Sequence, residues 1–177
     1  MDLERFRGYL SVLARLGFDR KLSPKMDPSD IVQETLLEAH RSRDLFRGKT
    51  VGEQAAWLRS ILSCNLANAG RDLRRAKRDL ARERSIDDSS LRLEAWLRSE
   101  GSSPSGRFTR EERVLLLSEA IASLPVDEQD VLLFRYCMDW TLEAIGEHLG
   151  VSRNTVARLL RRSLAALRDR LRSLDVP

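Results

Sequence analysis

The stretch TLEAIGEHLGVSRNTVARLL, residues 141–160, decides the fold of the C-terminal part of the chain. Its apolar residues recur at the spacing of one helical face, first before a glycine and then after it. Gly150 stands where a left-handed turn residue is needed, and Ser152 can cap a second helix through its hydroxyl. This pattern predicts two short helices joined by a tight turn. The supporting positions are the apolar face of the first helix (Leu142, Ile145 and Leu149), small residues that let a second helix cross closely (Ala144 and Gly146), an apolar plug between the helices (Val151) and inward-pointing residues of the second helix (Val156, Leu159 and Leu160).

The outward face of the second predicted helix carries arginine, asparagine and threonine, which form hydrogen bonds to base edges and phosphates in the DNA major groove. Residues 150–177 contain seven arginines and only two acidic residues, so this segment has a local charge of +5, against +4 for the whole chain. The alternative is a generic helical hairpin with a solvated arginine face, but glycine, plug and cap together favour a helix-turn-helix that reads DNA. The candidate DNA-reading residues are Arg153, Asn154, Thr155, Arg158, Arg161 and Arg162.

Two further helices are predicted before this motif. One apolar pattern runs from Glu111 to Leu124, where Pro125 ends it, and a second begins at Val126 and continues to about Cys137. With the motif itself, these helices predict a four-helix domain. That domain is expected at 111–177, with its helix-turn-helix at about 141–162.

The N-terminal part predicts a three-helix domain at 1–84. Its helices are expected over 3–16, 27–41 and 51–85. Asp27 can be the N-cap of the second helix, with Pro28 in its first turn. After Gly70 the third helix changes character, because residues 71–84 hold seven basic and three acidic side chains. Such a basic end is suited to phosphates.

Residues 85–110 differ from both flanking domains. Serine, glycine and proline at 101–106 mark a flexible linker. A short apolar patch, Leu91–Leu97, predicts either a short helix that docks elsewhere or a packed turn. A patch docked on one domain would hold the free protein closed, with its DNA-binding faces covered.

Composition narrows the class of protein. The 177 residues are 42% hydrophobic, which is enough for two small cores. No apolar run approaches the about 20 residues of a membrane span, and the first residues lack the apolar core of a signal peptide. We therefore expect a cytoplasmic protein that binds no membrane.

Few side chains suited to catalysis or metal binding occur in the chain. Cys64 and Cys137 lie far apart inside helical apolar patterns, which predicts two reduced core thiols and no metal site. His40 and His148 stand on separate helices without a paired carboxylate, and we expect His148 at the surface. The sequence thus predicts no catalytic residue, no metal, no cofactor and no small-molecule substrate, and the protein is not expected to be an enzyme.

Outside the linker, the chain resembles the bacterial ECF (extracytoplasmic function) sigma factors of the sigma-70 superfamily. DPSDIVQETLLEAHR at 27–41 is similar to the helix that grips the β′ clamp helices of RNA polymerase. FRGKTVGEQAAWLRSILSCNLANAGRDLRR at 46–75 resembles the segment that opens and reads the −10 promoter element. SLPVDEQDVLLFRYCMDWTLEAIGEHLGVSRNTVARLLRRSLAALRDRL at 123–171 resembles the domain that reads the −35 element. The resemblance implies an all-α transcription initiation factor with a sigma2-like domain, a flexible linker and a sigma4-like domain.

The resemblance also implies roles for residues of the N-terminal domain. A polar face of the second helix would bind polymerase, although without the resemblance the same residues indicate an ordinary solvated acidic face. The loop 44–50 would capture an unstacked base, and its Phe46 either lines the pocket or anchors the core. Trp57, in the helix that follows, is either at the core edge or a stacking platform. Cys64 and Asn68 depart from the Asn and Asp often found in the family, which alters the details of −10 recognition. The polymerase-binding candidates are Asp30, Gln33, Glu34 and Glu38; the −10 candidates are Phe46, Arg47, Lys49, Thr50, Asn65, Asn68, Arg71, Arg74, Arg75 and Arg78.

The implied partners are core RNA polymerase, through its β′ clamp helices and β flap, and promoter DNA, which would place the protein on the nucleoid. An anti-sigma factor is a common partner in the family but leaves no mark on this sequence. The main alternative is a helix-turn-helix regulator that dimerises through its N-terminal helices and does not bind polymerase. A regulator that binds a partner helix without touching DNA is a second alternative.

Overall fold

The computed structural model describes residues 2–17, 27–76, 91–92, 95 and 109–175, without the side chains of 70–76 and 174–175. The described residues form helices, turns and short connectors and no strand, which confirms the predicted all-α class. The chain divides into two compact units, Met1–Ser90 and Leu91–Pro177. The division falls inside the expected linker at 85–110.

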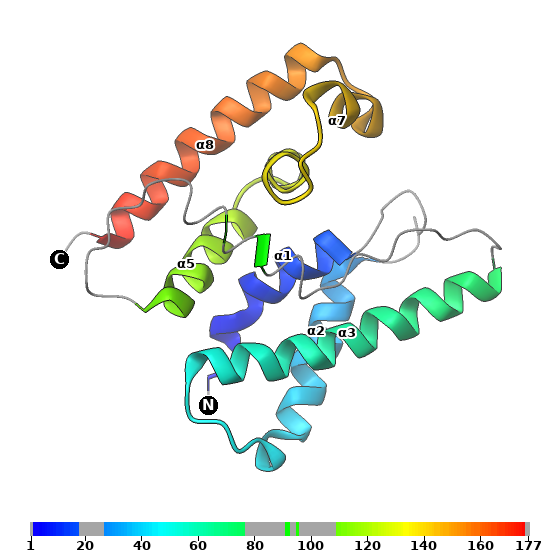
Figure 1. Cartoon of the computed structure of the whole chain (residues 1–177), viewed down its shortest axis with the longest axis vertical. Helices are drawn as coiled ribbons and strands as arrows, with labels where there is room; N and C mark the ends of the chain where they lie inside the picture. Colours follow the sequence, from blue (N-terminus) through cyan, green and yellow to red (C-terminus); the bar gives the residue numbers. More distant parts are fainter. Residues whose placement is uncertain (1, 18–26, 77–90, 93–94, 96–108, 176–177) are drawn as a thin grey trace. The chain divides into compact units, whose positions relative to one another are not determined.

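The N-terminal unit contains three long helices that pack pairwise against one another (Figure 1). Its elements are η1 (Glu4–Phe6), α1 (Arg7–Gly17), α2 (Pro28–Arg41), η2 (Arg43–Leu45) and α3 (Val51–Ala76). The expected continuation of the third helix to residue 85 lies outside the described residues. As predicted, Asp27 caps α2, because its side chain accepts a hydrogen bond from the Ser29 backbone amide at 2.9 Å.

Apolar side chains from all three helices form the core of this unit. Leu10 and Leu13 of α1, Val32 of α2, and Leu58 and Leu62 of α3 are all at most 1% exposed. Each buried side chain of this size stabilises the fold by about 1.5–3 kcal/mol relative to an exposed one. The burial of one face leaves the opposite face of α2 in solvent.

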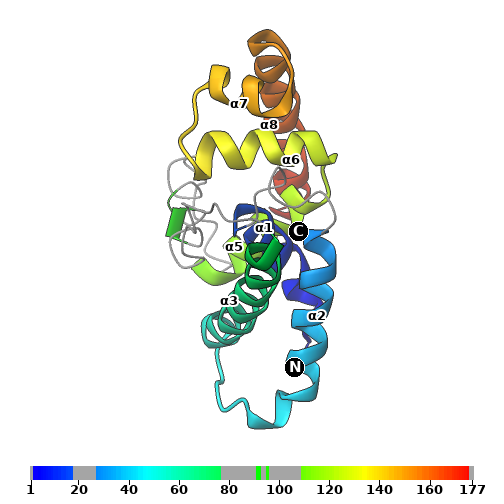
Figure 2. The same cartoon turned by 90° about the vertical axis from the view of Figure 1, so that its right-hand side faces the viewer.

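In the C-terminal unit, helices pack around one long C-terminal helix (Figure 2). Its elements are α5 (Arg110–Ala122), α6 (Val126–Leu132), the π-helical turn η3 (Leu133–Cys137), α7 (Leu142–Leu149) and α8 (Arg153–Asp175). Helices α5, α6 and α7 each contact α8. Thr109 and Glu112 form a reciprocal capping box at the start of α5, and α6 begins after Pro125 as the sequence predicts.

The start of the apolar patch 91–97 belongs to the C-terminal unit. Arg92 donates hydrogen bonds to the Cys137 carbonyl and to the Asp139 carboxylate, both at 3.1 Å. Asp139 has a φ of 55°, so the backbone turns sharply where η3 ends. Leu91 is exposed, and residues 93–94 and 96–97 lie outside the described part of the chain.

Two predictions about surface and core residues were wrong. Cys64 is exposed on α3, because the apolar face of that helix is turned toward α1 and α2. Cys137 is buried as expected, and burial raises the pKa of its thiol to about 12. His148 is half-buried rather than at the surface, because its ring packs edge-on against Phe134 and Trp140, with ring centroids 5.0 and 5.1 Å away.

Candidate nucleic-acid interface

A tight turn between α7 and α8 forms the predicted helix-turn-helix. Gly150 has a φ of 72°, and its amide donates to the Gly146 carbonyl, which ends α7. The Val151 amide bonds to the same carbonyl at 2.9 Å. A Cβ at Gly146 would lie 2.7 Å from the Val151 carbonyl oxygen, so the turn requires glycine there. The close approach is thus made by the turn backbone, while the sequence predicted a crossing helix.

The second helix is capped as expected. The Ser152 hydroxyl accepts a hydrogen bond from the Thr155 amide at 3.2 Å and lies 3.0 Å from the Thr155 hydroxyl. Val151, however, is not the predicted apolar plug, because it is 38% exposed. Its backbone closes the turn, and its side chain is left at the surface.

The apolar interior fixes which face of α8 points outward. Val131 of α6, Ile145 of α7 and Val156 of α8 are fully buried together. The half-buried residues Leu142, Leu149, Leu159 and Leu160 pack against this cluster, as the sequence predicts for both helices. The opposite side of the first turns of α8 therefore faces solvent.

The structure divides the predicted DNA-reading residues into two groups. Asn154 and Arg158 are exposed, and neither forms a hydrogen bond or ion pair through its side chain within the described residues. Arg161 is also exposed, with one long hydrogen bond of 3.4 Å to the Ala157 carbonyl. Thr155 is half-buried, and its hydroxyl is engaged with Ser152.

Arg153 and Arg162 are already paired with carboxylates of other helices. The Arg153 Nε donates to Glu143 of α7 at 2.5 Å. Arg162 bonds to Glu128 of α6, whose side chain is only 4% exposed. No local sequence pattern predicts either pair, because the partners are 10 and 34 positions apart.

The N-terminal unit carries the second candidate surface, on the solvent face of α2. The four candidate residues Asp30, Gln33, Glu34 and Glu38 are all exposed. Leu37, which the sequence analysis missed, is 49% exposed within this polar face. Its helical spacing from Asp30, Gln33 and Glu34 was the available signal, since Leu37 falls outside the buried stripe. An exposed leucine among acidic side chains is suited to protein contact.

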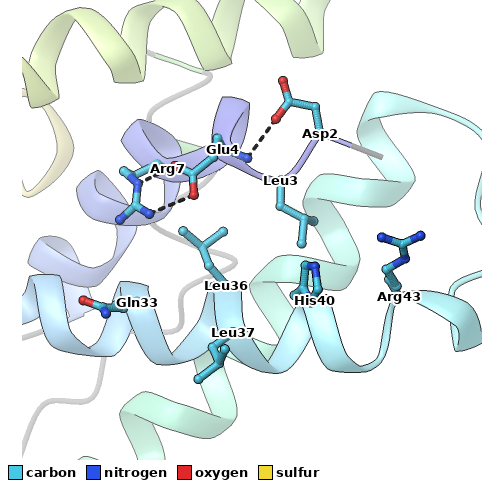
Figure 3. Close-up of a pocket in the computed structure, with 9 residues that line it drawn as sticks. All are labelled: Asp2, Leu3, Glu4, Arg7, Gln33, Leu36, Leu37, His40 and Arg43. Carbon is cyan, nitrogen blue, oxygen red and sulfur yellow. Dashed lines mark hydrogen bonds and ion pairs between the residues drawn. The ribbon is translucent and has the colours of Figure 1, made fainter.

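A cavity of about 410 Å³ borders this face, between η1 and α2 (Figure 3). Leu3 of the N-terminal segment and Leu36 of α2 point into the space between these elements, Gln33 lies farther along α2, and Leu37 points to the other side of the helix. The Glu4 carboxylate pairs with Arg7 on its edge at 2.7 Å. The cavity is therefore continuous with the polar face, and it adds apolar area to it.

The loop that precedes α3 is held in place by packing and by hydrogen bonds. The Phe46 ring stacks on Trp57 with centroids 4.9 Å apart, and both residues are half-buried. The Glu53 carboxylate accepts hydrogen bonds from the backbone amides of Lys49 and Thr50 and from the Thr50 hydroxyl. These donors lower the pKa of Glu53. Arg47 and Lys49 are exposed, whereas the Thr50 hydroxyl serves as a cap of α3.

Along α3, the structure separates the other −10 candidates. Asn65 is 8% exposed, and its amide donates to the Thr35 hydroxyl at 3.2 Å and to Glu38 at 3.3 Å. It therefore ties α3 to α2 instead of facing solvent, because the helix crossing covers its side of α3. Asn68 is exposed. The side chains of Arg71, Arg74 and Arg75, and the whole of Arg78, are outside the described residues.

Residues 120–169, from the end of α5 into α8, match the family model for sigma-70, region 4. The ECF RNA polymerase sigma factor SigL of Mycobacterium tuberculosis (strain ATCC 25618 / H37Rv) is 31% identical over 147 residues, which cover 83% of this chain and 76% of SigL. The chain belongs to the ECF RNA polymerase sigma factor family. The ECF RNA polymerase sigma factor SigG of strain CDC 1551 / Oshkosh is 30% identical over 171 residues, covering 85% of this chain and 45% of SigG.

This ECF sigma factor is a DNA-binding transcription initiation factor that directs RNA polymerase to promoters, as the resemblance implied. The alternative of a dimeric regulator that acts without polymerase is not favoured. Sigma factors as a family are not enzymes. Within the described segments, no cluster of histidine, cysteine or acidic residues could hold a metal ion, and no helix has the length and apolarity to cross a membrane.

Proposed function

We propose that this sigma factor reads the upstream (−35) promoter element with the N-terminal turns of α8. The observation that carries the proposal is the exposure of Asn154 and Arg158, whose side chains have no partner within the described residues, beside a buried apolar interior that fixes their direction. Asparagine pairs with adenine and arginine with guanine through two hydrogen bonds in the major groove. Recognition helices make these contacts through their N-terminal residues.

Replacing Arg158 or Asn154 with alanine is expected to weaken binding of holoenzyme to its cognate upstream element by about 1–3 kcal/mol, roughly 5- to 150-fold. The measurement is a binding titration on promoter duplexes that carry single base-pair changes. A base contact is expected to remove discrimination at one position only. Arg168→Ala is the matched control, because Arg168 is exposed on the same helix about three turns further on. Equal weakening on every sequence would show a phosphate contact and contradict the base-reading role.

For the −10 element, we propose that the loop before α3 captures an unstacked base of the non-template strand. Arg47 and Lys49 are exposed beside the stacked rings of Phe46 and Trp57, and the basic residues that follow Gly70 would hold phosphates. Extruding a base from the duplex costs a few kcal/mol, which stacking and hydrogen bonds in a shaped loop can offset. The ordered backbone at Lys49 and Thr50 supports such a preformed loop.

Gly48→Ala is expected to impair promoter opening. A Cβ at Gly48 would lie 2.2 Å from the Phe46 ring and 2.9 Å from the Glu53 Cβ, so the ring must leave its place on Trp57. Forced rearrangements of packed side chains cost about 1–3 kcal/mol. Permanganate footprinting of the −10 region should show reduced opening, while binding to an upstream-element duplex stays unchanged. Normal opening by the variant would mean that the placement of Phe46 is not part of base capture.

For polymerase, we propose that the solvent face of α2 contacts the β′ clamp helices, with the C-terminal unit on the β flap. The face combines exposed carboxylates with Leu37 and a neighbouring cavity. Such a surface complements a basic partner that also brings apolar side chains. The protein would then work in the cytoplasm on the nucleoid. An anti-sigma factor that covered this face or the outward face of α8 would inhibit it.

A further inference from the structure

One ion pair spans the helix-turn-helix at the point where α8 begins. Arg153 is the first residue of α8, and its Nε donates to Glu143, in the first turn of α7, at 2.5 Å. Both side chains are 59% exposed, so the pair lies at the surface that would face DNA. Neither residue belongs to the apolar cluster of Val131, Ile145 and Val156 that holds the two helices together.

The carboxylate of this pair stands where α7 begins. The pKa of Glu143 is held below its ordinary value, first by its own backbone amide, then by Arg153, and also by the Thr141 hydroxyl. Thr141 caps α7 by accepting a hydrogen bond from the Ala144 amide at 3.1 Å. Glu143 stands in the first turn of α7, beside this capped end, and its hydrogen bond with Arg153 restricts the long arginine side chain to few rotamers.

The hydrogen bond leaves a defined set of donors on Arg153. With Nε engaged by Glu143, the N–H groups of Nη1 and Nη2 remain on the outer edge of the guanidinium. Guanine offers two acceptors in the major groove, O6 and N7, and an arginine fork pairs with both. An arginine fork that is already held in one orientation loses less conformational entropy when it binds guanine.

The net charge of the Arg153–Glu143 pair favours a contact with a base over a contact with a phosphate. Arg153 and Glu143 together carry no net charge, so they neutralise no phosphate, and the carboxylate repels one that comes close. The guanine edge is uncharged. It can accept hydrogen bonds from the arginine fork while Arg153 stays paired with Glu143 and the site stays neutral. A neutral pair at the first turn of a recognition helix is therefore suited to base reading.

We propose that Glu143 is a specificity-determining positioning residue, which holds Arg153 so that it reads a guanine at one position of the upstream element. The inference rests on the proposed function of α8. Glu143 acts only through Arg153 and touches no base. Arg153 is the residue that contacts DNA.

The experiment is selection of promoters by holoenzyme from a library with a randomised upstream element. The variants are Glu143→Ala, Arg153→Ala and the double variant, and Glu147→Ala is the control. Glu147 is an exposed acid on the same helix as Glu143, one turn further along. Wild type and the control are expected to prefer guanine at one position by about tenfold or more. Glu143→Ala is expected to reduce that preference to threefold or less, at the same position that Arg153→Ala affects.

Two further readouts distinguish positioning from a structural role or a general charge effect. The double variant should select the same sequences as Arg153→Ala, because Glu143 has no function without its partner. The salt dependence of DNA binding should have the same slope in the double variant as in wild type, since a neutral pair is removed and no phosphate contact is lost. Thermal unfolding temperatures of all variants should match within about 2 °C, because both side chains are exposed.

The outcomes separate this inference from the function on which it rests. An unchanged guanine preference in Glu143→Ala, or loss at a position different from that of Arg153→Ala, would overturn the inference and leave the reading role of α8 intact. A wild-type holoenzyme without any base preference in the upstream element would overturn the reading role itself.

Discussion

The double variant Asp30→Lys/Glu34→Lys is expected to lose core RNA polymerase almost completely, with at least about a 100-fold fall in affinity. Both carboxylates are exposed on the solvent face of α2, one helical turn apart, where they can meet basic side chains of a partner. Reversal replaces two attractions with two repulsions, and like charges placed together in an interface cost several kcal/mol. Co-purification with core polymerase measures binding, and run-off transcription measures function.

The appropriate control changes the same charge elsewhere. Glu111→Lys/Glu119→Lys alters two exposed carboxylates of α5, and this variant should bind polymerase like wild type. The helical content of Asp30→Lys/Glu34→Lys should be retained and its unfolding temperature should fall by only a few degrees, because neither side chain contributes to the core and the one structural loss is the acidic charge of Asp30 in the first turn of α2. Full retention of polymerase by the reversed variant would refute the proposed docking face.

Leu37 gives an independent test of the same surface. If the cavity between η1 and α2 receives an apolar side chain of the partner, Leu37→Ser should weaken polymerase binding without any change in charge. A loss of affinity in Leu37→Ser would show that the acidic side chains of α2 do not account for all of the binding to polymerase. Acidic side chains favour encounter and orientation, whereas burial of apolar area supplies much of the affinity.

The parts of the fold that sequence could predict are those governed by local rules. Gly150, Ser152 and Asp27 stand at positions whose backbone conformation or capping needs dictate the residue, and the structure places all three as predicted. Helical periodicity likewise separates the buried face of α2 from its solvent face, because the spacing of apolar residues alone fixes which side is buried.

The predictions that failed depend on contacts between elements. Val151 looked like a plug, but the turn is closed by its backbone, so its side chain remains exposed. Asn65 remains a candidate for −10 recognition, but α2 lies against it, and only the crossing of two helices determines that contact. His148 was placed at the surface, although η3 brings two aromatic rings to it. No local pattern encodes such neighbours.

The site shows the same division between local and tertiary information. The sequence identified the outward residues of α8, since they follow from the periodicity of that helix. It did not distinguish Asn154 and Arg158, which lack side-chain partners within the described residues, from Arg162, which is paired with a buried carboxylate. The six candidates therefore differ in exposure and in side-chain partners, and the ion pairs of Arg153 and Arg162 arise from α7 and α6.

Arg162→Ala is expected to destabilise the C-terminal unit by about 1–3 kcal/mol, through the loss of an ion pair between α6 and α8. Glu128 lies on α6 with its side chain 4% exposed, and Arg162 of α8 is its ionic partner. Removing one member of such a pair leaves a buried charge without compensation, which costs about 3–5 kcal/mol when both members are buried. The cost is smaller here, about 1–3 kcal/mol, because the Arg162 side chain is 66% exposed and water can reach the site after truncation.

Urea unfolding followed by circular dichroism measures this loss of stability. Two further variants test whether it arises from the ion pair. Arg161→Ala removes an adjacent exposed arginine that has no carboxylate partner within the described residues, and it should change stability by less than about 0.5 kcal/mol. Glu128→Leu/Arg162→Leu removes both charges together and should recover most of the lost stability, since apolar replacement of a buried pair is often neutral or better. If Arg162→Ala were as stable as Arg161→Ala but lost promoter affinity on all sequences, Arg162 would be a phosphate contact and not the link between α6 and α8.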